Sequence, residues 1–152
     1  MLAVPVQRSS ILLAKFIVVA IWSAALTIVI FIAGMVMGVV IKLPGGSISV
    51  VLQGSVLLAI TACLEIAVVM PFALFASMGR GYLLPMGVVI LMAIMANLIV
   101  VTGWGEFFPW SVPGLYSQGM HITPISYWIV ILTCLVGMFG TYLWWMFADQ
   151  SR

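Results

Sequence analysis

Charged residues are scarce in this chain. Among 152 residues there are three Asp and Glu and five Lys and Arg, which is 5% of the sequence. Soluble domains carry roughly a quarter charged residues, so these few charges cannot cover a water-soluble fold. The net charge of +2 is also too small to indicate a nucleic-acid partner. We therefore expect a chain whose solvent is the lipid bilayer, with no nucleic acid bound.

Cysteine, histidine and nucleotide-binding motifs are equally sparse. Cys63 and Cys134 lie far apart in apolar runs and form no CxxC motif, so they indicate neither a disulfide nor a metal framework. His121 is the one histidine, whereas a buried haem usually needs a second strong axial ligand. The sequence has no nucleophile motif and no phosphate-binding loop. We therefore expect no catalytic residue, metal or cofactor, and no enzymatic activity, in this chain.

Apolar residues are abundant: they make up 66% of the sequence, with a mean hydropathy of +1.38. Their runs are continuous rather than alternating, which is typical of transmembrane helices and not of barrel strands. The fold class predicted is all-α, a polytopic membrane helix bundle that forms one transmembrane domain over 1–152. The predicted spans are 11–42, 55–77, 84–102 and 124–147.

The segment before the first span combines a rigid turn with cations. Pro5 disfavours helix just before it, and Ser9 or Ser10 can cap the helix that follows. Arg8 and Lys15 lie where the positive-inside tendency places cations on the cytoplasmic face. Two interpretations stay open: an ordinary helix start with an orientation signal, or a cytoplasmic elbow that docks on a soluble partner.

Glu65 is the one acid within a predicted span. A charged carboxylate at mid-helix costs about 2.5–3.5 kcal/mol on insertion scales, so it should face protein or water, or be protonated. One interpretation is a proton or substrate site. The other is a neutral acid hydrogen-bonded to a neighbour such as Thr27, Thr133 or Asn97, the strongly polar residue of the third span.

Proline and glycine mark two packing features of the spans. Pro71 leaves the carbonyl of Ala67 without its intrahelical donor, which predicts a kink in the second span. Gly34 and Gly38 form a GxxxG pair in the first span, which allows another helix to approach closely.

A long aromatic stretch, 103–123, separates the third and fourth spans. Two prolines interrupt it, and its indole and phenol rings favour the headgroup region. We therefore expect short interfacial helices or a re-entrant cap, in which Glu106 is more typical of a surface carboxylate than of a catalyst. The candidate residues of this aromatic stretch are Trp104, Glu106, Pro109, Trp110, Pro113 and Tyr116.

Orientation follows from the positions of the cations. With a cytoplasmic N-terminus, Arg8, Lys15, Arg80 and Arg152 lie inside and Lys42 lies outside, as the positive-inside tendency favours. Both termini are then cytoplasmic, and the aromatic stretch faces outward.

Several segments, in their order and spacing, resemble a known family. They are PVQRSSILLAKF, a long span ending in GG, FALFASMGRGYLLP, NLIVVTGWGEFFPWSVPGLYSQG and a last span ending in LWWMFADQ. They resemble ABC transporter permeases of the type-2 exporter class, and most closely the bacterial subfamily linked to bacitracin and lantibiotic resistance. The resemblance covers nearly the whole chain.

The resemblance implies a role for the segment before the first span. In that class a cytoplasmic segment of the type PVxRxxILLAK contributes to the contact with the ATPase subunit. Carried over by position, Pro5, Arg8, Ser9, Ser10 and Lys15 fall in or beside that coupling segment. The stretch 104–116 matches the extracellular re-entrant region between the last two spans of the family.

The resemblance also implies partners and a location. ATP and Mg would bind a separate ATP-binding subunit, two permease chains would pair as a dimer, and the bilayer would be the bacterial plasma membrane. Members of the class have six spans, and this chain begins where their second span ends, so we expect two N-terminal spans to be missing. A gene fragment, a late start codon or a split subunit would each explain that difference.

Three functional hypotheses remain. The first is the permease subunit of an ATP-driven exporter for a hydrophobic or amphipathic peptide. The second is a small proton-coupled transporter that uses Glu65 and needs no ATPase. The third is a non-transporting assembly subunit or a fragment.

Overall fold

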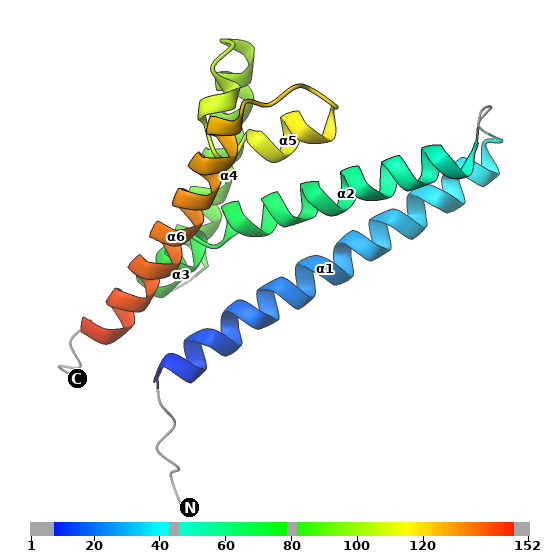
Figure 1. The fold of residues 1–152 in the computed structure, drawn as a ribbon. Coiled ribbons are helices and arrows are strands. Elements are labelled where there is room, and N and C mark those ends of the chain that lie inside the picture. Colours follow the sequence, from blue (N-terminus) through cyan, green and yellow to red (C-terminus); the bar gives the residue numbers. More distant parts are fainter. Residues whose placement is uncertain (1–7, 43–45, 79–81, 148–152) are drawn as a thin grey trace, which may run out of the picture.

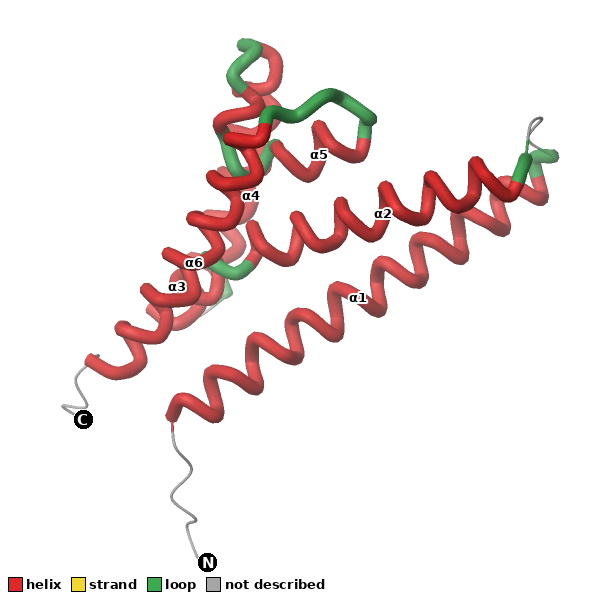
Figure 2. Tube along the Cα trace, in the orientation of Figure 1, coloured by secondary structure: helices red, strands yellow, loops and turns green. Residues whose placement is uncertain are grey.

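The computed structural model describes residues 8–42, 46–78 and 82–147, and within these residues every regular element is a helix (Figure 2). The all-α prediction is therefore confirmed. The elements are α1 (Arg8–Val40), α2 (Ile48–Val69), α3 (Phe72–Met78), α4 (Leu83–Val101), the 3-10 helix η1 (Gly105–Phe107), α5 (Val112–Ser117) and α6 (Pro124–Phe147).

The described part of the chain contains four helical segments that are long and apolar enough to cross a membrane. They are Ser10–Val40, Ile48–Met78, Leu83–Val101 and Pro124–Phe147. Their mean hydropathies lie between 1.8 and 2.7, which confirms the polytopic bundle. At 1.5 Å per residue, α1 with its 33 residues extends about 50 Å, so it must tilt or project from a hydrocarbon layer about 30 Å thick.

Two helices begin earlier than the sequence predicted. Because α1 already begins at Arg8, Ser9 and Ser10 lie inside the helix and the predicted serine cap is wrong; serine is only a moderately poor helix former. The second span was expected to begin at residue 55, but α2 begins at Ile48. The Ser47 hydroxyl oxygen accepts the Val50 N–H at 3.4 Å and so caps α2 at its start.

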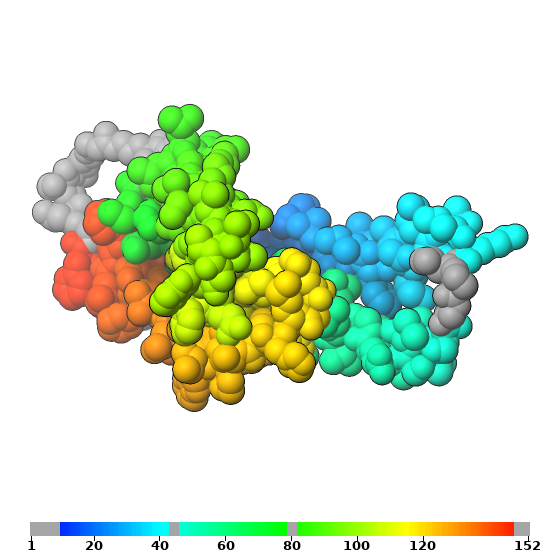
Figure 3. Space-filling model, turned by 90° about the horizontal axis from the view of Figure 1, so that it is seen from above, coloured from blue at the N-terminus to red at the C-terminus, as the bar shows by residue number. Residues whose placement is uncertain are grey.

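The helices form two groups that meet at the break between α2 and α3 (Figure 1). In one group α1 and α2 run antiparallel and side by side, and their far ends project from the rest of the molecule (Figures 1 and 3). In the other group α3 packs along α6 and also contacts α4. The short helix α5 lies against α2, and η1 contacts α4, α5 and α6.

Buried side chains concentrate around the break between α2 and α3. Leu12, Phe16 and Met70 form one set, which we call the α1 cluster. Val68, Val112 and Val130 form a second set, which we call the α5 cluster. By contrast, α4 contributes no buried residue, so the contacts that hold the two groups together lie near the break.

Candidate functional site

Pro71 interrupts the second span where the sequence predicted a kink. The helix α2 ends at Val69 and α3 begins at Phe72. The first hydrogen bonds of α3 run from Ala73 N–H to the Met70 carbonyl and from Leu74 N–H to the Pro71 carbonyl, both at 3.1 Å. These three-residue bonds replace the four-residue pattern that proline cannot continue.

The break between α2 and α3 lies in close contact with α6 at Gly137. A Cβ atom on Gly137 would lie 2.5 Å from Pro71 Cα and 2.7 Å from Pro71 N, far inside van der Waals contact. Only glycine therefore lets α6 pass this close to the break. Of the GxxxG pair of the first span, Gly34 makes no comparable approach, because no heavy atom lies within 4 Å of a Cβ built on it.

Trp110 of the aromatic stretch hydrogen-bonds the broken helix. Its indole N–H donates to the Val68 carbonyl at 3.0 Å. The sequence predicted that Pro71 would leave the Ala67 carbonyl without an intrahelical donor. The indole N–H bonds the carbonyl of the following residue, Val68. The Trp110 ring also lies 6.0 Å from Phe72, the first residue of α3, and 5.3 Å from Phe108, measured between ring centres.

The aromatic stretch contains two short helices, η1 and α5, and the prediction of short helices here is confirmed. The buried Ser111 hydroxyl donates to the carbonyls of Gly105 and Phe108. The half-buried Glu106 carboxylate accepts the Thr123 N–H at 3.4 Å, which ties the two ends of the stretch together. These bonds give Glu106 a structural role within the stretch.

The other candidate residues of the aromatic stretch occupy different environments. Trp104 is 66% exposed, with its ring centre 5.7 Å from that of Phe107. Pro109 is half-buried, whereas Pro113 is buried in the first turn of α5. Tyr116 lies edge-on to Tyr127 of α6, with ring centres 6.5 Å apart. Of the predicted residues, Trp110 alone contacts the break through both a hydrogen bond and its ring.

The first turns of α1 approach the break from another direction. Leu12 and Phe16 are the buried side chains there, and both pack with Met70, the residue immediately before Pro71. The half-buried side chains packed around them are Ile66, Ala73, Cys134 and Trp145. The start of α1 therefore contacts α2, α3 and α6 together.

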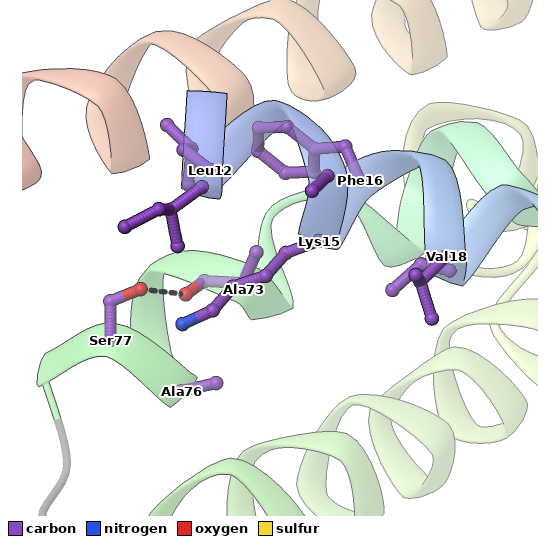
Figure 4. Close-up of a pocket in the computed structure, with 10 residues that line it drawn as sticks. Leu12, Lys15, Phe16, Val18, Ala73, Ala76 and Ser77 are labelled. Carbon is purple, nitrogen blue, oxygen red and sulfur yellow. Dashed lines mark hydrogen bonds between the residues drawn. The ribbon is translucent and has the colours of Figure 1, made fainter. Parts of the chain in front are cut away.

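Lys15 extends from α1 toward the end of α3, beside a groove of about 510 Å³ that α1 and α3 line (Figure 4). Its Nζ lies 4.5 Å from the centre of the Trp145 ring, a cation–π contact with the last turns of α6. The Trp145 indole N–H in turn donates to the Ser77 hydroxyl at 3.0 Å, and Ser77 donates to the Ala73 carbonyl at 2.7 Å. These contacts join the start of α1 to the ends of α3 and α6.

The remaining residues of the predicted coupling segment precede or begin α1. Pro5 lies outside the described residues. Arg8 is the first residue of α1, Ser9 follows it, and Ser10 is exposed. The structure thus brings Lys15 into contact with other helices and places Ser10 on the surface.

Glu65 and Asn97 are both exposed and do not contact each other through a hydrogen bond. Asn97 donates to the Ala93 carbonyl at 2.8 Å, Thr27 donates to that of Ser23 at 2.9 Å, and Thr133 donates to that of Ile129 at 2.8 Å. None of these three bonds involves Glu65, and whether this acid is bonded to a neighbour stays a prediction. Polar side chains inside a helix commonly bond their own backbone, one turn back.

Several residues that build this site carry no distinctive signal in the sequence. Phe16, Met70, Ser77 and Gly137 were not distinguished from other residues of apolar spans, and their roles arise from contacts between distant helices. A buried glycine opposite a proline break is a signal that helix packing rules could have suggested. Within the described residues no group of three or more His, Cys, Asp or Glu side chains could hold a metal ion.

The fold and the site define a polytopic helical membrane protein with one broken span. Residues 1–96 match the family described as ABC-2 family transporter protein, so the chain belongs to that family and is a membrane-embedded transport permease. It is similar to the bacitracin transport permease protein BCRB of Bacillus licheniformis, with 22% identity over 153 residues that cover 98% of this chain and 74% of that protein. No solved structure matches the chain.

Proposed function

We propose that this chain is the membrane subunit of an ATP-driven exporter. The observation that carries the proposal is the match of residues 1–96 to the ABC-2 transporter family. The sequence contains no phosphate-binding loop, so ATP and Mg would bind a separate ATP-binding subunit and hydrolysis would take place there.

The start of α1 is the proposed docking point for that subunit. It carries Arg8 and Lys15, and the positive-inside tendency favours the cytoplasmic side for them. Leu12 and Phe16 pack against Met70, so a force applied at the start of α1 would act directly on the broken span. This placement makes both termini cytoplasmic and turns the aromatic stretch outward.

The proposed cargo is a hydrophobic or amphipathic peptide. The support is the similarity to a bacitracin transport permease, because bacitracin is a peptide antibiotic. Two copies of the permease would pair around the substrate path in the bacterial plasma membrane.

Co-expression of this chain with a candidate ATP-binding subunit, in a bacitracin-sensitive host, tests the exporter. We expect the inhibitory concentration of bacitracin to rise only when that subunit can hydrolyse ATP. We also expect Arg8→Glu to abolish co-purification of the two proteins, whereas the control Lys42→Glu, beyond the other end of α1, should not. Co-purification that survives Arg8→Glu would contradict docking at the start of α1.

A second candidate function is proton-coupled transport at Glu65. It is favoured by the exposure of this carboxylate near the middle of the span Ile48–Met78, because a membrane-embedded acid is by default a candidate functional residue. Transport that survives ATP depletion but is lost on Glu65→Gln and on collapse of the proton gradient would establish it. No effect of either Arg8→Glu or Glu65→Gln would instead favour a non-transporting assembly subunit.

A further inference from the structure

We propose that Met70–Pro71 is a hinge between two rigid groups of helices, and that Trp110 is the positioning residue that sets its angle. Through this hinge the start of α1 would be mechanically connected to the aromatic stretch. The direction in which the movement passes rests on the proposed function, whereas the connection itself rests on packing.

One side of the hinge is clamped to α6. At the beginning of α3, Pro71 lies against Gly137 with no room for a Cβ atom. Near the end of α3, Ser77 accepts the Trp145 indole N–H at 3.0 Å. Because both ends of this short helix are attached to α6, we infer that α3 and α6 move as one body.

On the other side of the hinge, α2 contacts α5 and α6 beside the break and then projects away from them with α1 (Figure 1). The helix α2 packs along α1, and their far ends project away from the remaining helices (Figure 3). Grooves of about 510 Å³ and about 430 Å³ lie on two sides of the first turns of α1, toward α3 and α6 respectively. We therefore infer that α1 and α2 form the second body and turn at the break.

Residues on the α2 side of the hinge belong to two different clusters. Met70 belongs to the α1 cluster, and Val68, two residues earlier in the chain, belongs to the α5 cluster. A change in the direction of α2 at this point alters both clusters together, because packed side chains cannot deform continuously.

Trp110 touches both bodies at once. Its indole N–H is bonded to Val68 in α2, while its ring packs beside Phe72 in α3. An α2 helix that turned away from α3 would have to break this hydrogen bond or separate these rings. Trp110 thereby holds the hinge at the angle seen in the structure.

The test measures how fast a cysteine in the α5 cluster reacts. Val112→Cys is introduced into the full chain in membrane vesicles, with Cys63→Ser and Cys134→Ala removing the native thiols. Val112 is 0% exposed, so its labelling by a water-soluble maleimide reports opening of the α5 cluster. The assay contains no ATP-binding subunit and measures no transport, so its failure is distinct from failure of the proposed function.

Two variants are compared with matched controls. Trp110→Phe removes the indole N–H, and Leu12→Ala loosens the α1 cluster at the far side of the hinge. Loss of about one hydrogen bond or an equivalent contact should raise the labelling rate roughly 2- to 10-fold in each. The controls Trp104→Phe and Leu13→Ala, at residues 66% and 59% exposed, should leave the rate unchanged.

A second reporter separates hinge movement from unfolding. Thr141 of α6 is also 0% exposed and belongs to the clamped body. With Thr141→Cys in place of Val112→Cys, Leu12→Ala should not change the labelling rate. The proposal is overturned if Leu12→Ala leaves Val112→Cys as slow as Leu13→Ala does, or if it accelerates both reporters equally.

Discussion

The two clusters beside the break are packed to different degrees. In the α5 cluster, Val112 and Val130 are 0% and 1% exposed, and a hydrogen bond from Trp110 secures the adjacent carbonyl. In the α1 cluster, Leu12 and Phe16 retain slight exposure and are bordered by open grooves. The side chains of the α5 cluster are therefore tightly packed in one arrangement, whereas those of the α1 cluster can adjust their packing.

In a membrane, this difference in packing determines how firmly each side is held. Lipid tails are as apolar as leucine, so contact between helices gains little from the hydrophobic effect and depends on close packing and hydrogen bonds. The α5 side has both of these. The α1 side has side-chain packing, the Lys15–Trp145 contact and a hydrogen bond from Trp145 to Ser77, which joins α6 to α3 without involving α1. We therefore expect α1 to be held more weakly and to be the more movable of the two.

The largest effect is expected where α6 crosses the break. Gly137→Ala would place a Cβ atom 2.5 Å from Pro71 Cα, and overpacking of this kind costs about 1–3 kcal/mol or more. We expect the detergent-solubilised chain to lose its monodisperse peak at a clearly lower temperature. Gly140→Ala is the matched control, because its Cβ would meet Leu74 Cδ2 at an ordinary 3.5 Å; equal behaviour of the two variants would contradict the close crossing.

Trp110→Phe should have the next largest effect. It keeps a ring beside Phe72 but leaves the carbonyl of Val68, a residue only 5% exposed, without its donor. An unsatisfied buried acceptor costs about 1–3 kcal/mol. The same thermal assay measures this loss, and a variant as stable as the unaltered chain would show that the hydrogen bond contributes nothing.

Trp145→Phe should be milder, which sharpens the comparison of the two sides. It also removes one indole N–H, but the Ser77 hydroxyl keeps its own bond to the Ala73 carbonyl. We therefore expect a loss of about 0.5–1.5 kcal/mol, smaller than that of Trp110→Phe in the same assay. The reverse order would mean that the α1 side is the more tightly held.

Glu65→Gln should have the smallest effect on stability. Glu65 is exposed, and the hydrogen bonds of Thr27, Asn97 and Thr133 go to their own helices. Exposed substitutions of this kind usually change stability by within about 0.5 kcal/mol. A marked drop in the temperature of the monodisperse peak would reveal a structural role for this carboxylate.

Sequence periodicity and composition predicted most of the fold. Continuous apolar runs identified the four spans, and the last one was predicted at 124–147 where α6 spans Pro124–Phe147. Proline chemistry located the break at Pro71, and aromatic content predicted the short helices between the last two spans. The second span was predicted to begin at residue 55, whereas a serine cap at Ser47 lets α2 begin at Ile48.

The contacts of the site were less predictable, because they join helices that are distant in sequence. A local motif pointed to Gly34 and Gly38 for close packing, but Gly34 has no close neighbour, whereas Gly137 makes a tight approach to a proline in another span. Lys15 was predicted to act at the start of the first span, but nothing near it in sequence indicates that it lies over Trp145. Such pairs depend on how the helices cross, which local patterns do not determine.

Photo-crosslinking from the two ends of α1 tests the account most directly. Benzoylphenylalanine is placed at position 8 or at position 42, and the chain is irradiated in membranes together with a candidate ATP-binding subunit. The account predicts crosslinks to that subunit from position 8 and none from position 42. Crosslinks from position 42 alone would place the subunit at the opposite end of α1 and contradict the proposed coupling.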